Sequence, residues 1–183
     1  MKKSDINPMP DYFDRYINLV ADVELSQAFD DSIEQLNDLD KNLLEAIGNK
    51  KPVPDKWMPK EIIQHIIDFE RILSFRALLF ARREGSIPQS VDQDRLAENM
   101  RAEKRSIDSL ITELKAVRAS SKAMFDNFDE EMLLAKGINW KYEISVLAMG
   151  FALLGHQIHH LKIIEENYYP LPVNDLSLSD KRM

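Results

Sequence analysis

The chain has 183 residues, of which 44% are hydrophobic and 30% charged, so its composition is that of one globular domain and not of a disordered chain. A formal net charge of −7 and the lack of any basic run exclude a typical nucleic-acid binder, which needs a basic face to meet phosphates. The absence of cysteine excludes disulfides, cysteine nucleophiles and thiolate metal ligands.

The N-terminal segment and the longest apolar run do not have the patterns of a secretory signal or a membrane span. The N-terminus has two lysines but no apolar run of the kind found in a secretory signal. The longest apolar run, residues 144–158, is too short to span a bilayer and contains a histidine. We therefore expect a soluble cytoplasmic protein that associates with neither membrane nor nucleic acid.

Apolar residues recur at three- and four-residue spacing in four segments, which predicts four helices. The first covers about residues 24–47, and the second about 59–83, with proline in its first turn where no N–H is needed. The third covers about 95–125. The fourth, about 143–168, is apolar nearly all round in its first half and should be the most enclosed. No segment is predicted as a strand.

Four helices without strands predict an all-α fold, a four-helix bundle. We interpret residues 1–183 as a single domain with its core between about 16 and 170 and a loose C-terminal tail at about 171–183. An apolar and aromatic cluster near the N-terminus is expected to pack across the bundle: Met9, Pro10, Tyr12 and Phe13.

Histidine is rare and unevenly placed, since three of the four residues lie in "GHQIHH" at 155–160. His156 and His160 are four apart on a helix, so they project from one face and could share a divalent ion. His65 is flanked by Ile62 and Phe69 on the apolar face of the second helix and should also point inward. His159 points about 100° away from His160 and is expected to support the site from outside the ligand set or to lie at the surface.

Whether these histidines can meet depends on how far along the bundle axis each one lies. His65 lies ~9 Å from the start of its helix and His160 ~12 Å from the end of its own, so the heights match if the second and fourth helices are antiparallel. That requires an up-down-down-up topology with a crossover between the second and third helices. The linker at residues 84–94 can span ~36 Å when nearly extended, which is about the length needed.

Four carboxylates are candidates for catalysis, although none is singled out as the general base. Glu61 and Asp68 lie four before and three after His65, so either could orient a ligand imidazole through its second nitrogen. Both could equally be solvated helix carboxylates. Asp92 and Asp94 belong to the linker, which could cover the mouth of the site, or they could serve as loop and helix-cap acids.

The chain resembles the DinB/YfiT-like superfamily, specifically its DinB_2 branch, from "YINLV" at 16–20 to "NYYP" at 167–170. The resemblance rests on three stretches: "KWMPKEIIQHIIDFERILSFRALLFAR", the acidic linker "VDQDR" and "GHQIHHLKII". It implies an up-down-down-up bundle and a divalent metal, often nickel or zinc, held by His65, His156 and His160. Relatives include metal-dependent hydrolases and transferases or isomerases that use low-molecular-weight thiols, and homodimers are common.

Three protein ligands would leave a coordination position open, which is typical of a catalytic site. Two reactions on a small-molecule substrate follow. In the first, metal-bound water attacks an amide or ester. In the second, a thiol attacks an electrophile as thiolate, and because the chain has no cysteine this thiol must be a cosubstrate. The alternative is a non-enzymatic bundle that binds a metal or small ligand as a sensor, or that only dimerises.

Overall fold

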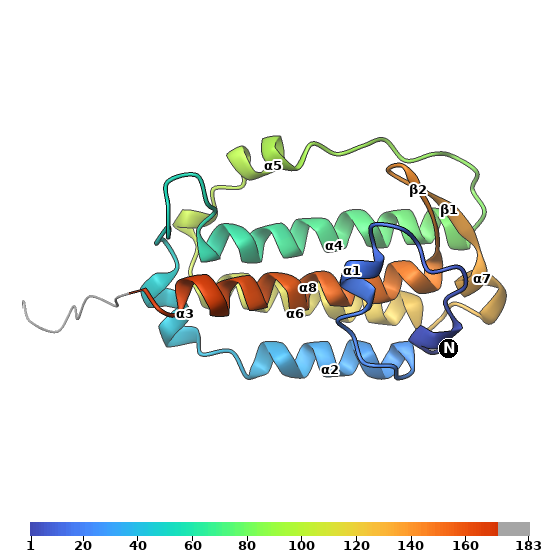
Figure 1. The fold of residues 1–183 in the computed structure, drawn as a ribbon, viewed down its shortest axis with the longest axis horizontal. Coiled ribbons are helices and arrows are strands. Elements are labelled where there is room, and N and C mark those ends of the chain that lie inside the picture. The colour runs from blue at the N-terminus through green and yellow to red at the C-terminus, as the bar shows by residue number, and fades with distance from the viewer. Residues whose placement is uncertain (172–183) are drawn as a thin grey trace, which may run out of the picture.

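Four long helices lie side by side in the computed structural model, which describes residues 1–171 (Figure 1). They are α2 (Leu25–Asn37), α4 (Pro59–Ala81), α6 (Ile107–Phe125) and α8 (Val146–Tyr168). The predicted all-α four-helix bundle is therefore confirmed. Shorter elements connect or cover these helices: η1 (Lys3–Asp5), α1 (Asp14–Ile17), α3 (Lys41–Ile47), α5 (Gln93–Asn99), η2 (Ala102–Lys104), α7 (Glu130–Leu134), β1 (Lys136–Asn139) and β2 (Tyr142–Ser145).

Contacts between side chains fix the directions of α4 and α6. Glu70 of α4 pairs with Arg118 of α6. One turn further along both helices, the hydroxyl groups of Ser74 and Ser121 lie 2.9 Å apart. From the first contact to the second, the residue numbers increase in both α4 and α6, so the two helices run parallel. The chain between them runs back along the bundle and carries α5 (Figure 1).

Helix α8 runs antiparallel to α4. His65 near the start of α4 meets His156 in the middle of α8, and the Tyr168 hydroxyl at the end of α8 donates to the carbonyl of Trp57, which precedes α4. Helix α2 points the same way as α8 (Figure 1). Histidines that lie far apart in the sequence are thereby brought to the same height.

The first and third predicted helices are wrong in extent, because each is interrupted by a cap. The segment predicted at 24–47 breaks after α2, where the Asp40 carboxylate accepts hydrogen bonds from the first backbone N–H groups of α3. The segment predicted at 95–125 breaks after α5, where Arg101 adopts a left-handed conformation with φ of 49°. Ser106 then caps α6 by accepting from the N–H of Ser109.

The expectation of no strands is also wrong. Strands β1 and β2 form an antiparallel hairpin in which Asn139 faces Tyr142 across the turn, and Ser145 ends the hairpin while it caps α8. Helix α8 therefore begins at Val146 and not at about residue 143. The strands of a short β-hairpin are stabilised by pairing with each other, and a search for helical periodicity does not detect this pairing.

The core supports the predicted enclosure of the fourth helix, since every residue from Val146 to Gln157 is buried. A buried ion pair joins three of the four helices: the Arg118 guanidinium donates to both Glu70 oxygens at 2.8 Å and to the Ser32 hydroxyl. Within residues 1–171 no helix combines the length and apolarity needed to cross a membrane. The tail predicted to be loose, at about residues 171–183, lies outside the described residues except for residue 171.

Candidate metal centre and its pocket

Three histidines converge where α4 faces α8. The Nε2 atom of His156 lies 3.2 Å from Nε2 of His65 and 3.0 Å from Nε2 of His160. One ring nitrogen from each of the three lies within 4.8 Å of the other two. His65 and His156 are buried and His160 is partly buried, so the structure brings together the three residues that the sequence singled out.

Burial keeps all three imidazoles neutral near pH 7. Desolvation lowers the pKa of His65 to about 4. Desolvation, with the neighbouring rings of His65 and His159, lowers the pKa of His160 to about 3. The pKa of His156 also falls well below its usual value, chiefly through desolvation. A neutral imidazole retains the nitrogen lone pair that a metal ion requires.

Aromatic rings provide this desolvation and hold the imidazoles in place. Phe69 stacks on His156 with ring centroids 4.5 Å apart, and Trp57 lies 4.9 Å from the ring of His65. The rings of Tyr16 in α1 and His156 form a T-shaped pair, with their centroids 5.3 Å apart. Helix α1 can come this close because residue 155 is glycine: a Cβ there would lie 1.9 Å from the Tyr16 carbonyl oxygen.

The donor set fits a divalent transition metal. Two imidazole nitrogens that bind one tetrahedral zinc ion at 2.0–2.1 Å are about 3.3 Å apart. The observed separations of 3.2 and 3.0 Å are close to this value. Nitrogen ligands without carboxylates suit zinc, nickel, copper or iron and are unsuited to magnesium or calcium.

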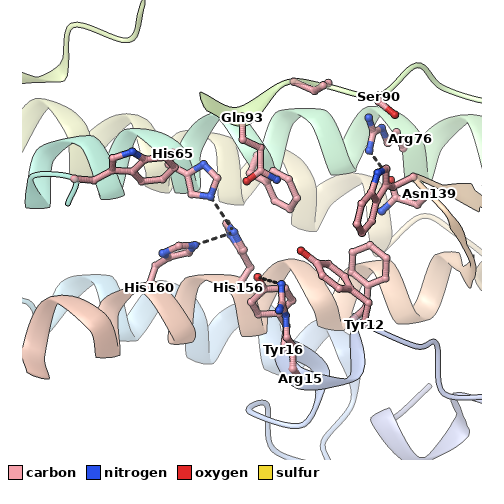
Figure 2. A pocket seen from close by; sticks show the side chains of 15 residues that line it. Tyr12, Arg15, Tyr16, His65, Arg76, Ser90, Gln93, Asn139, His156 and His160 are labelled. Carbon is pink, nitrogen blue, oxygen red and sulfur yellow. Dashed lines mark hydrogen bonds between the residues drawn. The ribbon is translucent and has the colours of Figure 1, made fainter. Parts of the chain in front are cut away.

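The three rings form one end of a cavity of about 370 Å³ (Figure 2). At the other end, Arg76 donates to the side-chain carbonyl of Asn139, and Tyr12, Tyr16 and Gln93 lie between the two ends (Figure 2). The cavity is lined mainly by aromatic, basic and neutral polar side chains: Tyr12, Phe13, Arg15, Tyr16, Trp57, His65, Phe69, Arg76, Ser90, Val91, Gln93, Asn139, Trp140, His156 and His160.

Several of these residues were missed by the sequence analysis. The sequence predicts an N-terminal segment packed across the bundle but no role for Tyr12 in the site, and no local pattern indicates a function for Arg76, Asn139 or Trp140. Tyr12 and Trp140 both have left-handed backbone conformations, with φ of 68° and 60°, and their rings contact at 5.3 Å. Such conformations are unfavourable for bulky residues and concentrate at functional sites, but they are visible only in the structure.

The four candidate acids do not line this cavity. Glu61 accepts from the backbone N–H of Met58, and Asp68 accepts from the Gln64 side chain, so neither is hydrogen-bonded to His65. Asp92 caps α5 by accepting from two backbone N–H groups. Asp94 lies in the first turn of α5 and borders a separate depression with Glu61.

The linker nonetheless contributes to the cavity, but through neutral residues and not through Asp92 or Asp94. Ser90, Val91 and Gln93 line it, and the Gln89 carbonyl accepts from Arg76. His159 stays outside the histidine cluster, with its ring 5.3 Å from that of Tyr16.

Together the bundle and its inward cluster of histidines define a candidate metalloprotein of the four-helix class. Residues 25–164 match the DinB superfamily, in its DinB_2 family. The chain therefore belongs to the DinB superfamily, which confirms the resemblance seen in the sequence.

Structural comparison points to the same class of fold. YfiT from Bacillus subtilis, described as a probable metal-dependent hydrolase with an unusual four-helix bundle topology, matches with a TM-score of 0.62 over 84% of each chain. The two sequences are 14% identical, so this likeness concerns the fold alone. No protein of curated function matches the sequence.

Proposed function

We propose that this protein is a divalent-metal-dependent enzyme acting on a small molecule bound in the cavity, with His65, His156 and His160 as the metal ligands. The observation that carries the proposal is the convergence of three neutral imidazole nitrogens at one end of an accessible cavity. When bound, a divalent ion with three protein ligands supplies an open coordination position and Lewis acidity. Nickel and zinc are the ions we expect.

The side chains around the histidines have distinct tasks in this proposal. Phe69 and Trp57 exclude water from the imidazoles and fix the ring planes. Tyr16 accepts a hydrogen bond from Arg15, and burial raises the pKa of its phenol, so its hydroxyl stays protonated and can donate to an oxygen of a substrate. The hairpin and the linker close the opposite end of the cavity.

Hydrolysis of an amide or ester is the first candidate reaction. It is supported by family membership and by the description of YfiT as a probable metal-dependent hydrolase. Water is a much weaker acid than a thiol, and although a bound divalent ion would lower the pKa of a water ligand, hydrolysis still profits from a nearby general base.

Transfer of a low-molecular-weight thiol is the second candidate, favoured by the chemistry of the cavity wall. Among the described residues that line it there is no Asp or Glu to act as base. A thiol with a pKa of about 8.5 needs far less help than water to become a nucleophile. Because the chain lacks cysteine, the thiol would be a cosubstrate.

Metal binding is tested first, by elemental analysis of protein purified without an affinity tag and then titrated with zinc or nickel. We expect one ion per chain. The variant His156→Ala should abolish stoichiometric binding, because His156 contacts both other ligands. His159→Ala is the matched control, since it removes a neighbouring histidine from outside the cluster. Full-affinity binding by His156→Ala would refute the ligand assignment.

Activity is tested with metal-loaded and chelated protein on a panel of esters and amides and on a panel of electrophiles with added thiols. Metal-dependent turnover in one panel identifies the reaction class. Loaded protein that turns over nothing in either panel would favour the non-enzymatic, ligand-binding alternative. The homodimer expected from the family resemblance is tested separately, by sedimentation equilibrium.

A further inference from the structure

A single arginine is buried at the end of the cavity opposite the histidines. Arg76 follows His65 by eleven residues on α4, which places it on nearly the same face, ~20° round the helix and ~16 Å along it. Its side chain lines the cavity, and only 6% of the residue is exposed. Figure 2 shows it at the far end from the three imidazoles.

The partners of Arg76 are neutral. One Nη donates to the side-chain oxygen of Asn139 at 2.5 Å and the other to the backbone oxygen of Gln89 at 2.8 Å. Within residues 1–171 no carboxylate forms an ion pair with it. The other deeply buried arginine, Arg118, has both oxygens of Glu70. Desolvation alone lowers the pKa of Arg76, with no carboxylate to offset it.

Burying a cation without a counter-ion is energetically unfavourable. A bound anionic ligand would supply the counter-ion that Arg76 lacks among the described residues. Arginine has five N–H donors in a planar fork. Two hydrogen bonds to neutral acceptors hold the guanidinium of Arg76 in place, and its remaining N–H groups can donate to two oxygens of an oxyanion. Asn139 and Gln89 act as positioning groups for this fork.

The charged side chain elsewhere in the described cavity lining is positive, like Arg76. Arg15, an exposed residue, also lines the cavity, with its guanidinium 3.9 Å from the centre of the Tyr12 ring. The three histidines are neutral, and the described lining contains no acidic side chain. The cavity is thus cationic in a chain whose net charge is −7. A low-dielectric cleft lined by one sign of charge concentrates small ions of the opposite sign.

We propose that the cavity binds an elongated organic anion whose carboxylate or phosphate group pairs with Arg76. Its apolar body lies along Phe69, Tyr12 and Trp140 and directs the reacting group toward the histidines. Only the chemistry at the histidine end rests on the proposed function; recognition of the anion does not.

The two tryptophans of the chain, Trp57 and Trp140, both line the cavity, so their fluorescence reports its occupancy without any label. Metal-free protein is titrated with three probes of similar shape: 4-phenylbutyrate, 3-phenylpropyl phosphate and the uncharged 4-phenylbutyramide. We expect at least one anion to bind about ten-fold more tightly than the amide, as a charge-assisted hydrogen-bonded pair provides. The anion that binds more tightly identifies the group that the site takes.

Variants then test whether the preference for anions over the amide depends on Arg76. Arg76→Gln should reduce anion affinity about ten-fold, to that of the amide, and leave the amide unchanged. Arg76→Lys should keep part of the preference, because it retains the charge but not the fork. Arg82→Gln removes a charge from the end of the same helix, outside this cavity, and should change nothing. The comparison of anion and amide on the unaltered protein stands even where a variant does not fold.

Equal binding of anions and amide, or no binding of either anion at millimolar concentration, would overturn the proposal. So would an anion preference that survives in folded Arg76→Gln. Metal binding is measured on the same samples, and Arg76→Gln should bind the ion as the unaltered protein does. A chain that binds metal but ignores the anion's charge refutes only the anion site. A chain that prefers anions but binds no metal refutes only the proposed metal chemistry.

Discussion

Acidification of the metal-free protein should destabilise it through His65. In the folded chain burial lowers the pKa of His65 to about 4, whereas in the unfolded chain it is near 6.5. Between these values the unfolded state binds more protons than the folded state, so the free energy of unfolding falls as pH falls. The stabilising contribution is fully present above pH 6.5 and is lost progressively as the pH approaches 4.

The magnitude follows from the two pKa values. At pH 5 the unfolded imidazole is almost fully protonated and the folded one is about nine-tenths neutral, which makes the loss about 2 kcal/mol. Well below pH 4 the loss approaches about 3 kcal/mol, since one pKa unit corresponds to about 1.4 kcal/mol. Only 7% of His65 is exposed, so solvent screening does not reduce this value substantially.

Urea unfolding at pH 7.5 and pH 5 measures the effect, with chelator present and with His65→Leu as the reference. Carboxylates, His156 and His160 titrate in both proteins, so the difference between the two losses reports the imidazole of His65. The unaltered protein should lose about 2 kcal/mol more than His65→Leu. His159→Leu serves as the control for a half-buried histidine and should behave more like the unaltered protein. Equal losses in the unaltered protein and His65→Leu would refute the assignment of a buried neutral imidazole.

Two further predictions concern the packing that holds the site. Glu70→Leu leaves the buried Arg118 guanidinium unpaired and should cost about 3–5 kcal/mol in urea unfolding, whereas Glu70→Leu combined with Arg118→Leu should recover much of that loss; equal costs for both would contradict the ion-pair argument. Gly155→Ala places a Cβ 1.9 Å from the Tyr16 carbonyl oxygen, so α1 must move and hydrogen exchange there should accelerate. Gly150→Ala meets side-chain atoms only, of Leu25 at 3.0 Å and of Phe125 at 3.2 Å, and should perturb less; similar effects of the two would argue against a backbone clash.

Local pattern was sufficient for much of the fold. The apolar stripes of the four long helices follow from 3.6-residue periodicity, and the same periodicity turns His65, His156 and His160 inward. Helix breaks were missed because apolar spacing continues across the caps at Asp40 and Ser106, where one side chain in a non-helical conformation ends the regular hydrogen bonding.

The sequence by itself determined that this chain forms a helical bundle with three histidines on buried faces, because apolar residues spaced three and four apart mark the buried face of each helix. Only the tertiary structure decided what surrounds them. Arg76 meets Asn139 across 63 positions of sequence, and Tyr16 reaches His156 because α1 crosses α8 at Gly155. Such contacts depend on how separate elements pack, and no local period records which side chains will share a cavity.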